Sequence, residues 1–257
     1  MNSASGWRVQ TLLQGYPATS KQQGGLGWST VALAHGPEGR IALLDTGRLG
    51  VRGRLLARLT EVGVSPAQVT DVLITHLHYD HCENWPMFPR AALHVGGAEL
   101  DWAVAQPEGT PMLPEFTVRA LAASPRLHRL AEGPTGLPGI SCFEAPGHSP
   151  HHLVFVLDGS PPVIFSSDVA KNRAELATGK ADITLNAAAH AASIARLRAV
   201  WAVHPGAVLI MGHDLPHVLD ASGQPRAQGA HAMAIEAWLG EDLEERTVFE
   251  LAPAPLR

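Results

Sequence analysis

Apolar and polar residues alternate from Trp7 to Leu13, and this period of two predicts a β-strand. Two apolar segments, 28–34 and 41–44, flank the turn Gly36-Pro-Glu-Gly39 and predict a β-hairpin. Short apolar runs bounded by turn residues predict five more strands, at 72–75, 140–144, 153–157, 163–166 and 207–211.

Helical periodicity appears between the strand segments. Apolar residues recur at helical spacing over 55–62, and Gly63 is the expected stop of that helix. Ser65-Pro-Ala-Gln68 has the form of a capping box with proline at the first helical position. The alanine-rich segment 187–202 predicts a long helix, and 230–239 predicts a last one.

Composition supports one globular domain. The chain has 257 residues with 46% hydrophobic content, enough to bury a full core. No change of composition marks a domain boundary, so we expect a single domain over 1–257. The stretch 106–138 is rich in proline and small residues, and the pattern assigns it no element. Because strands and helices alternate elsewhere, the fold class is predicted to be α/β.

Charge, apolar patterning and cysteine content indicate which classes of partner and which cellular location to expect. The net charge is −5 and no long basic run occurs, so we expect no nucleic-acid partner. No apolar stretch approaches the ~18 residues of a membrane span, and no signal peptide precedes Trp7, so we expect no membrane association. Nothing requires Cys82 and Cys142 to pair, and we expect a cytoplasmic protein with free thiols.

The chemistry concentrates in His76-Leu-His78-Tyr-Asp80-His81, directly after the predicted strand 72–75. Neutral imidazoles and carboxylates are ligands that suit zinc and similar divalent ions. Three further candidates each stand just past a predicted strand, in Ala145-Pro-Gly-His148, Phe165-Ser-Ser-Asp168 and Ile210-Met-Gly-His213. Strand ends collect ligands at one edge of an α/β sheet, so these groups predict a shared metal site.

The ordered set HxHxDH, PGH, SD and GH, which begins at Asp45-Thr-Gly47, resembles the metallo-β-lactamase superfamily of hydrolases. The resemblance implies a four-layer αββα sandwich with the metal site at one edge of the two sheets. It implies two divalent metal ions, with Zn²⁺ as the default and iron or manganese as alternatives. It also implies seven ligands: His76, His78 and His148 for one ion, Asp80, His81 and His213 for the other, and Asp168 as the bridge.

The same resemblance implies a reaction. A hydroxide between two cations would attack a carbonyl, and Asp80 would move a proton to the leaving group. Zinc β-lactamases of the superfamily lack an aspartate at the Asp168 position, so we expect a different substrate. Flavodiiron proteins have glutamate where this chain has His78, which argues against that branch. Two branches remain: quorum-quenching lactonases and glyoxalase II-like thioesterases.

Departures from those branches bear on the small-molecule substrate. Thioesterases usually have glycines after the first motif, where this chain has Cys82-Glu-Asn84-Trp85. Many lactonases have a tyrosine where this chain has Lys171, which we expect to be catalytic or substrate-binding or, equally, a solvated lysine. The leading hypothesis is a hydrolase of lactones or carboxylic esters. The alternatives are a glyoxalase II-like thioesterase and a non-catalytic metal-binding protein.

Residues near the motifs receive simpler expectations. Asp45 and Asp214 are expected to orient ligand histidines or to cap turns, and His152 to support the site. Cys82 is expected to be a small packed residue. Surface or helix-end positions are expected for His94, His190, His204 and His217. Core, pocket or subunit contacts, the last in a homodimer, are expected for Trp85, Met87, Phe88, Trp102, Met112 and Phe116.

Overall fold

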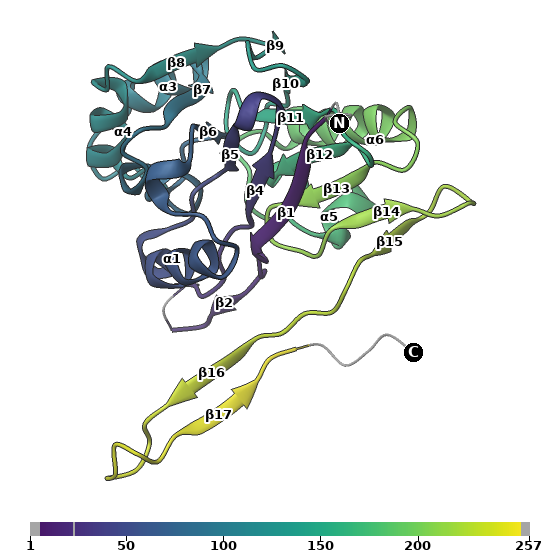
Figure 1. Ribbon diagram of the computed structural model, residues 1–257. Coiled ribbons are helices and arrows are strands. Elements are labelled where there is room, and N and C mark those ends of the chain that lie inside the picture. Colours follow the sequence, from purple (N-terminus) through teal and green to yellow (C-terminus); the bar gives the residue numbers. More distant parts are fainter. Residues whose placement is uncertain (1–5, 23, 253–257) are drawn as a thin grey trace.

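The computed structural model describes residues 6–22 and 24–252, and its centre is a pair of facing β-sheets (Figure 1). The first sheet has the strand order β1–β4–β5–β6–β7–β8. Its strands are β1 Arg8–Leu13, β4 Val31–His35, β5 Ile41–Leu44, β6 Asp71–Ile74, β7 Ala92–Gly96 and β8 Leu127–Leu130. The predicted hairpin is confirmed, because β4 and β5 pair in antiparallel register.

The second sheet has the order β15–β14–β13–β12–β11–β10–β9. Within it β12 and β13 run parallel, so their carboxyl ends meet at the same edge. Its strands are β9 Gly133–Pro134, β10 Ile140–Glu144, β11 Leu153–Leu157, β12 Val163–Ser167, β13 Val208–Met211, β14 His217–Leu219 and β15 Pro225–Ala227.

Helices cover the outer face of each sheet (Figure 1). The first sheet packs against α1 Arg52–Glu61, α3 Gly97–Ala105 and α4 Glu115–Ala122. The second packs against α5 Arg173–Thr178 and α6 Ala187–Ala202. These layers form the four-layer αββα sandwich that the resemblance implied. Short connections include α2 Tyr79–Cys82, η1 Pro37–Gly39, η2 Leu49–Val51, η3 Pro66–Gln68, η4 Trp85–Met87 and η5 Asp168–Ala170.

Alternation along the strands separates the core layers. In β4, Leu33 faces outward and joins the apolar cluster that contains Leu55 and Leu59 of α1. Its neighbour Ala32 faces inward and packs in the cluster that contains Phe165 of the second sheet. Small residues in β4 therefore let the two sheets approach, while leucines fill the space beneath the helices.

The predicted helices at 55–62 and 187–202 are confirmed by α1 and α6. Gly63, with φ 72°, follows the end of α1 as expected. The capping box at Ser65 is also present, although it opens only the short η3. The unassigned stretch 106–138 contains α4, β8 and β9.

The predicted helix at 230–239 is wrong. The chain there forms β16, Ala234–Ala237, which pairs with β17, Thr247–Glu250, in antiparallel register. Half-buried and exposed residues alternate along β16, which is the period of a strand. The partner strand is β17, which is rich in β-branched and aromatic residues. Because β17 lies outside the segment 230–239, the pattern of that segment alone does not reveal the pairing. A smaller two-stranded sheet joins β2 Thr19–Ser20 to β3 Gly24–Gly25.

Among helices in 6–22 and 24–252, none has the length and apolar character that crossing a bilayer requires.

Candidate metal centre

Four loops bring the predicted ligands together at one edge of the two sheets. The loop after β6 contains His76 and leads into α2, which contributes Asp80 and His81. In the second sheet, His148 follows β10 and Asp168 opens η5 directly after β12. His213 follows β13 in the same way, so all seven predicted ligands, including His78, stand just past strand ends.

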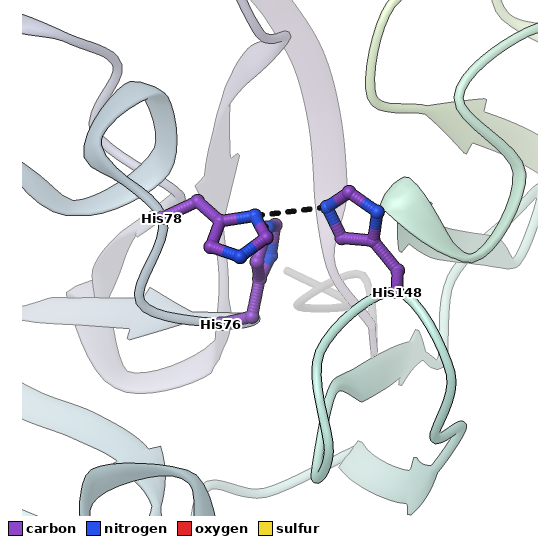
Figure 2. Close-up of side chains that lie close together, drawn as sticks. All are labelled: His76, His78 and His148. Carbon is purple, nitrogen blue, oxygen red and sulfur yellow. Dashed lines mark hydrogen bonds between the residues drawn. The ribbon is translucent and has the colours of Figure 1, made fainter. Parts of the chain in front are cut away.

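Three histidine rings form the first part of the cluster (Figure 2). His78 Nδ1 lies 3.1 Å from His76 Nε2 and 2.9 Å from His148 Nε2. His76 is fully buried, and the other two rings are nearly so. One nitrogen of each ring lies within 4.8 Å of one nitrogen of the other two, which is the arrangement of three ligands around one ion.

The second part combines histidines with carboxylates. Asp80 Oδ2 lies 3.5 Å from His81 Nε2 and 3.4 Å from His213 Nε2. Asp168 reaches both parts: Oδ1 lies 3.5 Å from His81 Nε2, and Oδ2 lies 3.3 Å from His148 Nε2 and 3.4 Å from His213 Nε2. The carboxylate of Asp168 therefore stands between the two groups of histidines.

Partners outside the cluster fix which ring nitrogen is free. His81 Nδ1 lies 2.8 Å from Asp45 Oδ2, and His148 Nδ1 lies 3.1 Å from the carbonyl oxygen of Ile183. Each Nδ1–H therefore donates outward, and each Nε2 faces the cluster. Asp45 also accepts from Ser167 Oγ at 2.9 Å and from the backbone N–H of Thr75 at 2.9 Å, which ties the two sheets together at the site.

The backbone conformation after β12 aims Asp168 into the cluster. Ser167 has φ 46°, which is uncommon for a residue with a Cβ and points to a strained position. Gly212 lies beside it, and a Cβ at Gly212 would collide with Asp168 Oδ1. Glycine is therefore required before His213 if Asp168 is to keep its place.

Electrostatics differ between the two parts. Burial, reinforced by the neighbouring histidines, lowers the pKa of His76 well below its usual value. Burial likewise lowers the pKa of His78 to about 4 and that of His148 well below the usual range, so these rings are neutral at pH 7. Burial opposes the charged form of His81 and His213 as well, but Asp80 and Asp168 outweigh it and raise both pKa values.

The cluster fits divalent metal ions. His81 Nε2 and Asp168 Oδ1 are buried without a hydrogen-bond partner in the described part of the chain. Such atoms are costly to bury unless a cation or a donor satisfies them. Imidazole nitrogens and carboxylate oxygens in this number are a ligand set for zinc, iron or manganese.

A pocket of about 290 Å³ opens onto the cluster. Four residues of the cluster line it: Asp80, His148, Asp168 and His213. The rest of its lining comes from the segment around β2 and β3, from α2, and from the loops near 112, 171 and 183. These residues are Tyr16, Pro17, Ala18, Thr19, Gly25, Gly27, Tyr79, Met112, Lys171, Asn172, Asp182 and Ile183. The segment 16–27 lies far from the metal motif in sequence and was not predicted to line the site.

Lys171 lines this pocket but is not a solvated lysine, because only 8% of its surface is exposed. Its ammonium lies 3.1 Å from Glu175 Oε1 and also bonds Asp182. Burial opposes its charge, but these carboxylates outweigh that effect and raise its pKa. The pair of carboxylates offsets its positive charge within the pocket wall.

The expectations for neighbouring residues are partly confirmed. Asp45 orients His81, whereas Asp214 caps a turn through Leu215 N–H and binds Arg173. His152 is buried and stacks on His76 with ring centroids 4.6 Å apart. Cys82 is packed in the core, where burial raises the pKa of its thiol well above the usual range and keeps it protonated.

Two of the remaining histidines contradict expectation. His190, in the first turn of α6, and His204, just past its last residue, stand at helix ends as predicted, although His190 is buried. His94 and His217 are not at helix ends and are buried as well. Each has a polar partner that compensates for its burial: His94 Nε2 lies 2.9 Å from Asp71 Oδ1, and His217 Nδ1 lies 2.8 Å from the oxygen of Leu215.

The six apolar residues near the motif divide between three environments. Trp85 and Phe88 belong to the core, and Met87 and Trp102 pack against it. Met112 lines the pocket, and Phe116 is 75% exposed.

One buried residue beside the cluster was not predicted from the sequence. Glu99 of α3 is fully buried, and its carboxylate accepts from Leu77 N–H at 3.3 Å, Ser149 Oγ–H at 3.0 Å and His151 N–H at 3.0 Å. Leu77 stands between two candidate ligands and Ser149 follows a third. One carboxylate thus holds both ligand loops, and nothing in the sequence around Glu99 signals that role.

Comparisons with known proteins identify the family of the chain. The sequence model of the metallo-beta-lactamase protein superfamily matches residues 24–213 of this chain. The human metallo-beta-lactamase domain-containing protein 1 is 31% identical over 234 residues, which cover 88% of this chain and 78% of that protein. An N-acyl homoserine lactonase of a Bacillus species is 24% identical over 185 residues, covering 64% of this chain and 68% of the lactonase.

Solved structures share the fold. A dizinc quorum-quenching lactonase in complex with a product superposes with a TM-score of 0.65 at 17% identity, covering 88% of this chain and 92% of that one. An N-acyl homoserine lactone hydrolase, with its product at the catalytic metal centre, gives a TM-score of 0.61 at 17% identity, covering 82% and 94%. The chain belongs to the metallo-beta-lactamase superfamily of metal-dependent hydrolases.

Proposed function

We propose that this protein is a dinuclear metal-dependent hydrolase that opens a lactone or carboxylic ester. The observation that carries the proposal is the position of Asp168, whose two carboxylate oxygens lie 3.3–3.5 Å from histidines of both groups. A carboxylate so placed suits a bridge between two ions. In the proposed site, His76, His78 and His148 would hold one ion, Asp80, His81 and His213 would hold the other, and Asp168 would be shared between them.

Two divalent ions, with Zn²⁺ as the default, would supply Lewis acidity and an activated water when bound. The side chains of the protein would orient the ligands and move a proton. The outward hydrogen bonds of His81 and His148 would keep both Nε2 atoms directed at the place where the ions would bind. Asp80 lines the pocket, and we assign it the transfer of a proton to the leaving alkoxide.

The pocket favours a small substrate without a free carboxylate. Tyr16, Pro17, Met112 and Ile183 offer apolar surface for an acyl group. We also assign substrate contact to Lys171, which lines the same wall. Because Glu175 and Asp182 pair with its ammonium, this wall offers little net positive charge to an anionic substrate. Two of the similar structures are lactone-hydrolysing enzymes, which is consistent with a neutral cyclic ester.

A substrate panel tests the proposal. Zinc-loaded protein is assayed by pH-stat at neutral pH with acylated γ-lactones, aryl esters and acyl thioesters. We expect turnover of lactones or esters, and we expect Asp80→Asn to abolish it. The control variant His35→Ala should retain the activity, because it changes a histidine of β4 that pairs with Arg8 of β1. Thioester turnover without lactone opening would favour the thioesterase alternative. A metal-loaded protein inert on all three classes would contradict the hydrolase proposal.

A further inference from the structure

The last described part of the chain leaves the sandwich as a hairpin (Figure 1). We call residues 234–250, which comprise β16, its loop and β17, the C-terminal arm. In the described chain, β16 and β17 form a sheet of two strands, so each strand has one open edge. Five large apolar residues of the arm are between 46% and 80% exposed: Trp238, Leu239, Leu243, Val248 and Phe249.

The base of the arm is fixed to the body. His231 Nε2 lies 2.8 Å from Asp214 Oδ1. The hydroxyl of Tyr16 donates to the carbonyl oxygen of Leu251, and Leu251 N–H donates to Met233 O at 2.7 Å. Met233 is buried, so the two ends of the arm are held together against the sandwich. The arm therefore projects from a defined place and is not a tail without anchorage.

An isolated two-stranded hairpin is at best marginally stable in water, and open strand edges with apolar side chains tend to associate. The arm needs a further surface to cover its apolar residues. We propose that this surface is a second copy of the same chain, and that two copies exchange their arms about a two-fold axis to form a homodimer. In such an arrangement each arm lies on the partner copy.

The exposed apolar surface is of the size that a dimer needs. Five side chains that are each about half to four-fifths exposed leave on the order of 400 Å² per arm. Two arms and the surfaces that they cover would bury on the order of 1,600 Å², which is a standard stable protein–protein interface.

The charge of the arm bears on which kind of partner can cover it. The arm holds six acidic residues and one basic residue, out of 24 acidic and 19 basic in the whole chain. It therefore has the entire net charge of −5, and the rest of the chain is neutral overall. A phosphate backbone or an anionic membrane would repel the arm, whereas the body of a second copy would not. The acidic residues are Glu236, Glu241, Asp242, Glu244, Glu245 and Glu250.

Sedimentation equilibrium at micromolar concentration tests the dimer. We expect a mass twice that of the 27.3 kDa chain. The triple variant Leu239→Gln, Leu243→Gln, Phe249→Thr should sediment as a monomer, with unchanged circular dichroism. The control variant Phe116→Gln, Val203→Gln changes two residues that are 75% and 72% exposed elsewhere, and it should remain a dimer. A monomeric wild type, or a dimeric arm variant, would overturn the proposal.

Hydrogen exchange supplies a second readout that does not depend on a variant. The amides of β16 and β17 that face the open edges should exchange slowly at dimer concentrations and at least tenfold faster on dilution to the monomer. Exchange at one fast rate over the whole range, in protein shown to be dimeric, would place the interface elsewhere and exclude the arm.

Discussion

Asp45 Oδ2 lies 2.8 Å from Nδ1 of His81, and both side chains are completely buried. Asp45 stands at the end of β5 with φ 53°, an uncommon conformation that turns its carboxylate toward α2. The contact joins the first sheet to the metal cluster. It also fixes the His81 tautomer that leaves Nε2 free for a ligand role.

Replacing Asp45 by asparagine should therefore weaken metal binding. An amide keeps the size of the side chain but removes the charge that favours Nδ1–H of His81. We expect metal affinity to fall about 10- to 100-fold. Competition with a chromophoric chelator measures the change. The matched control Asp101→Asn alters an exposed ion pair with Arg129 and should leave affinity unchanged. Equal affinity in wild type and Asp45→Asn would refute the orienting role.

Glu99 should affect both ligand loops at once. Glu99→Ala leaves three donors without their acceptor and should lower the free energy of unfolding by about 3 kcal/mol, with weaker metal binding. Glu99→Gln retains one acceptor oxygen, so its losses should be smaller in both measurements. Thermal unfolding with and without a chelator, together with metal titration, separates the two effects. A variant that loses stability but binds metal as tightly as wild type would limit Glu99 to a structural role.

Asp71 should make stability depend on pH at a place outside the metal cluster. Burial alone would raise its pKa, but hydrogen bonds from His94 and Thr70 lower it below the usual 3.8. A carboxylate with a lowered pKa stabilises the fold above the unfolded pKa, and this contribution is lost as pH falls through the folded pKa. Asp71→Asn should cost about 2 kcal/mol at neutral pH, and the difference should shrink below about pH 4.

Urea unfolding of chelator-treated wild type and Asp71→Asn, at neutral and acidic pH, measures that difference. Removing metal from both proteins separates the effect from ligand protonation. A gap that stays constant across the range would mean that the Asp71 carboxylate is not the group responsible.

Much of the fold and cluster could be predicted because the signals are local. Each predicted ligand follows an apolar strand, and the strand ends of the two sheets meet at one edge. The arm could not be predicted, because β16 acquires its conformation by pairing with β17 ten residues further on. Glu99 escaped for the same reason: the three donors that it binds come from loops 22–52 residues away.

Metal content per chain tests the two-metal site most directly. Zinc-loaded, dialysed protein is analysed by inductively coupled plasma mass spectrometry beside His78→Ala and the control His35→Ala, with lactone or ester hydrolysis measured on the same samples. Two zinc ions per chain in wild type and control, and at most one with lost activity in His78→Ala, is the predicted result. One zinc ion or none in wild type, or full metal content with normal activity in His78→Ala, would contradict the dinuclear assignment.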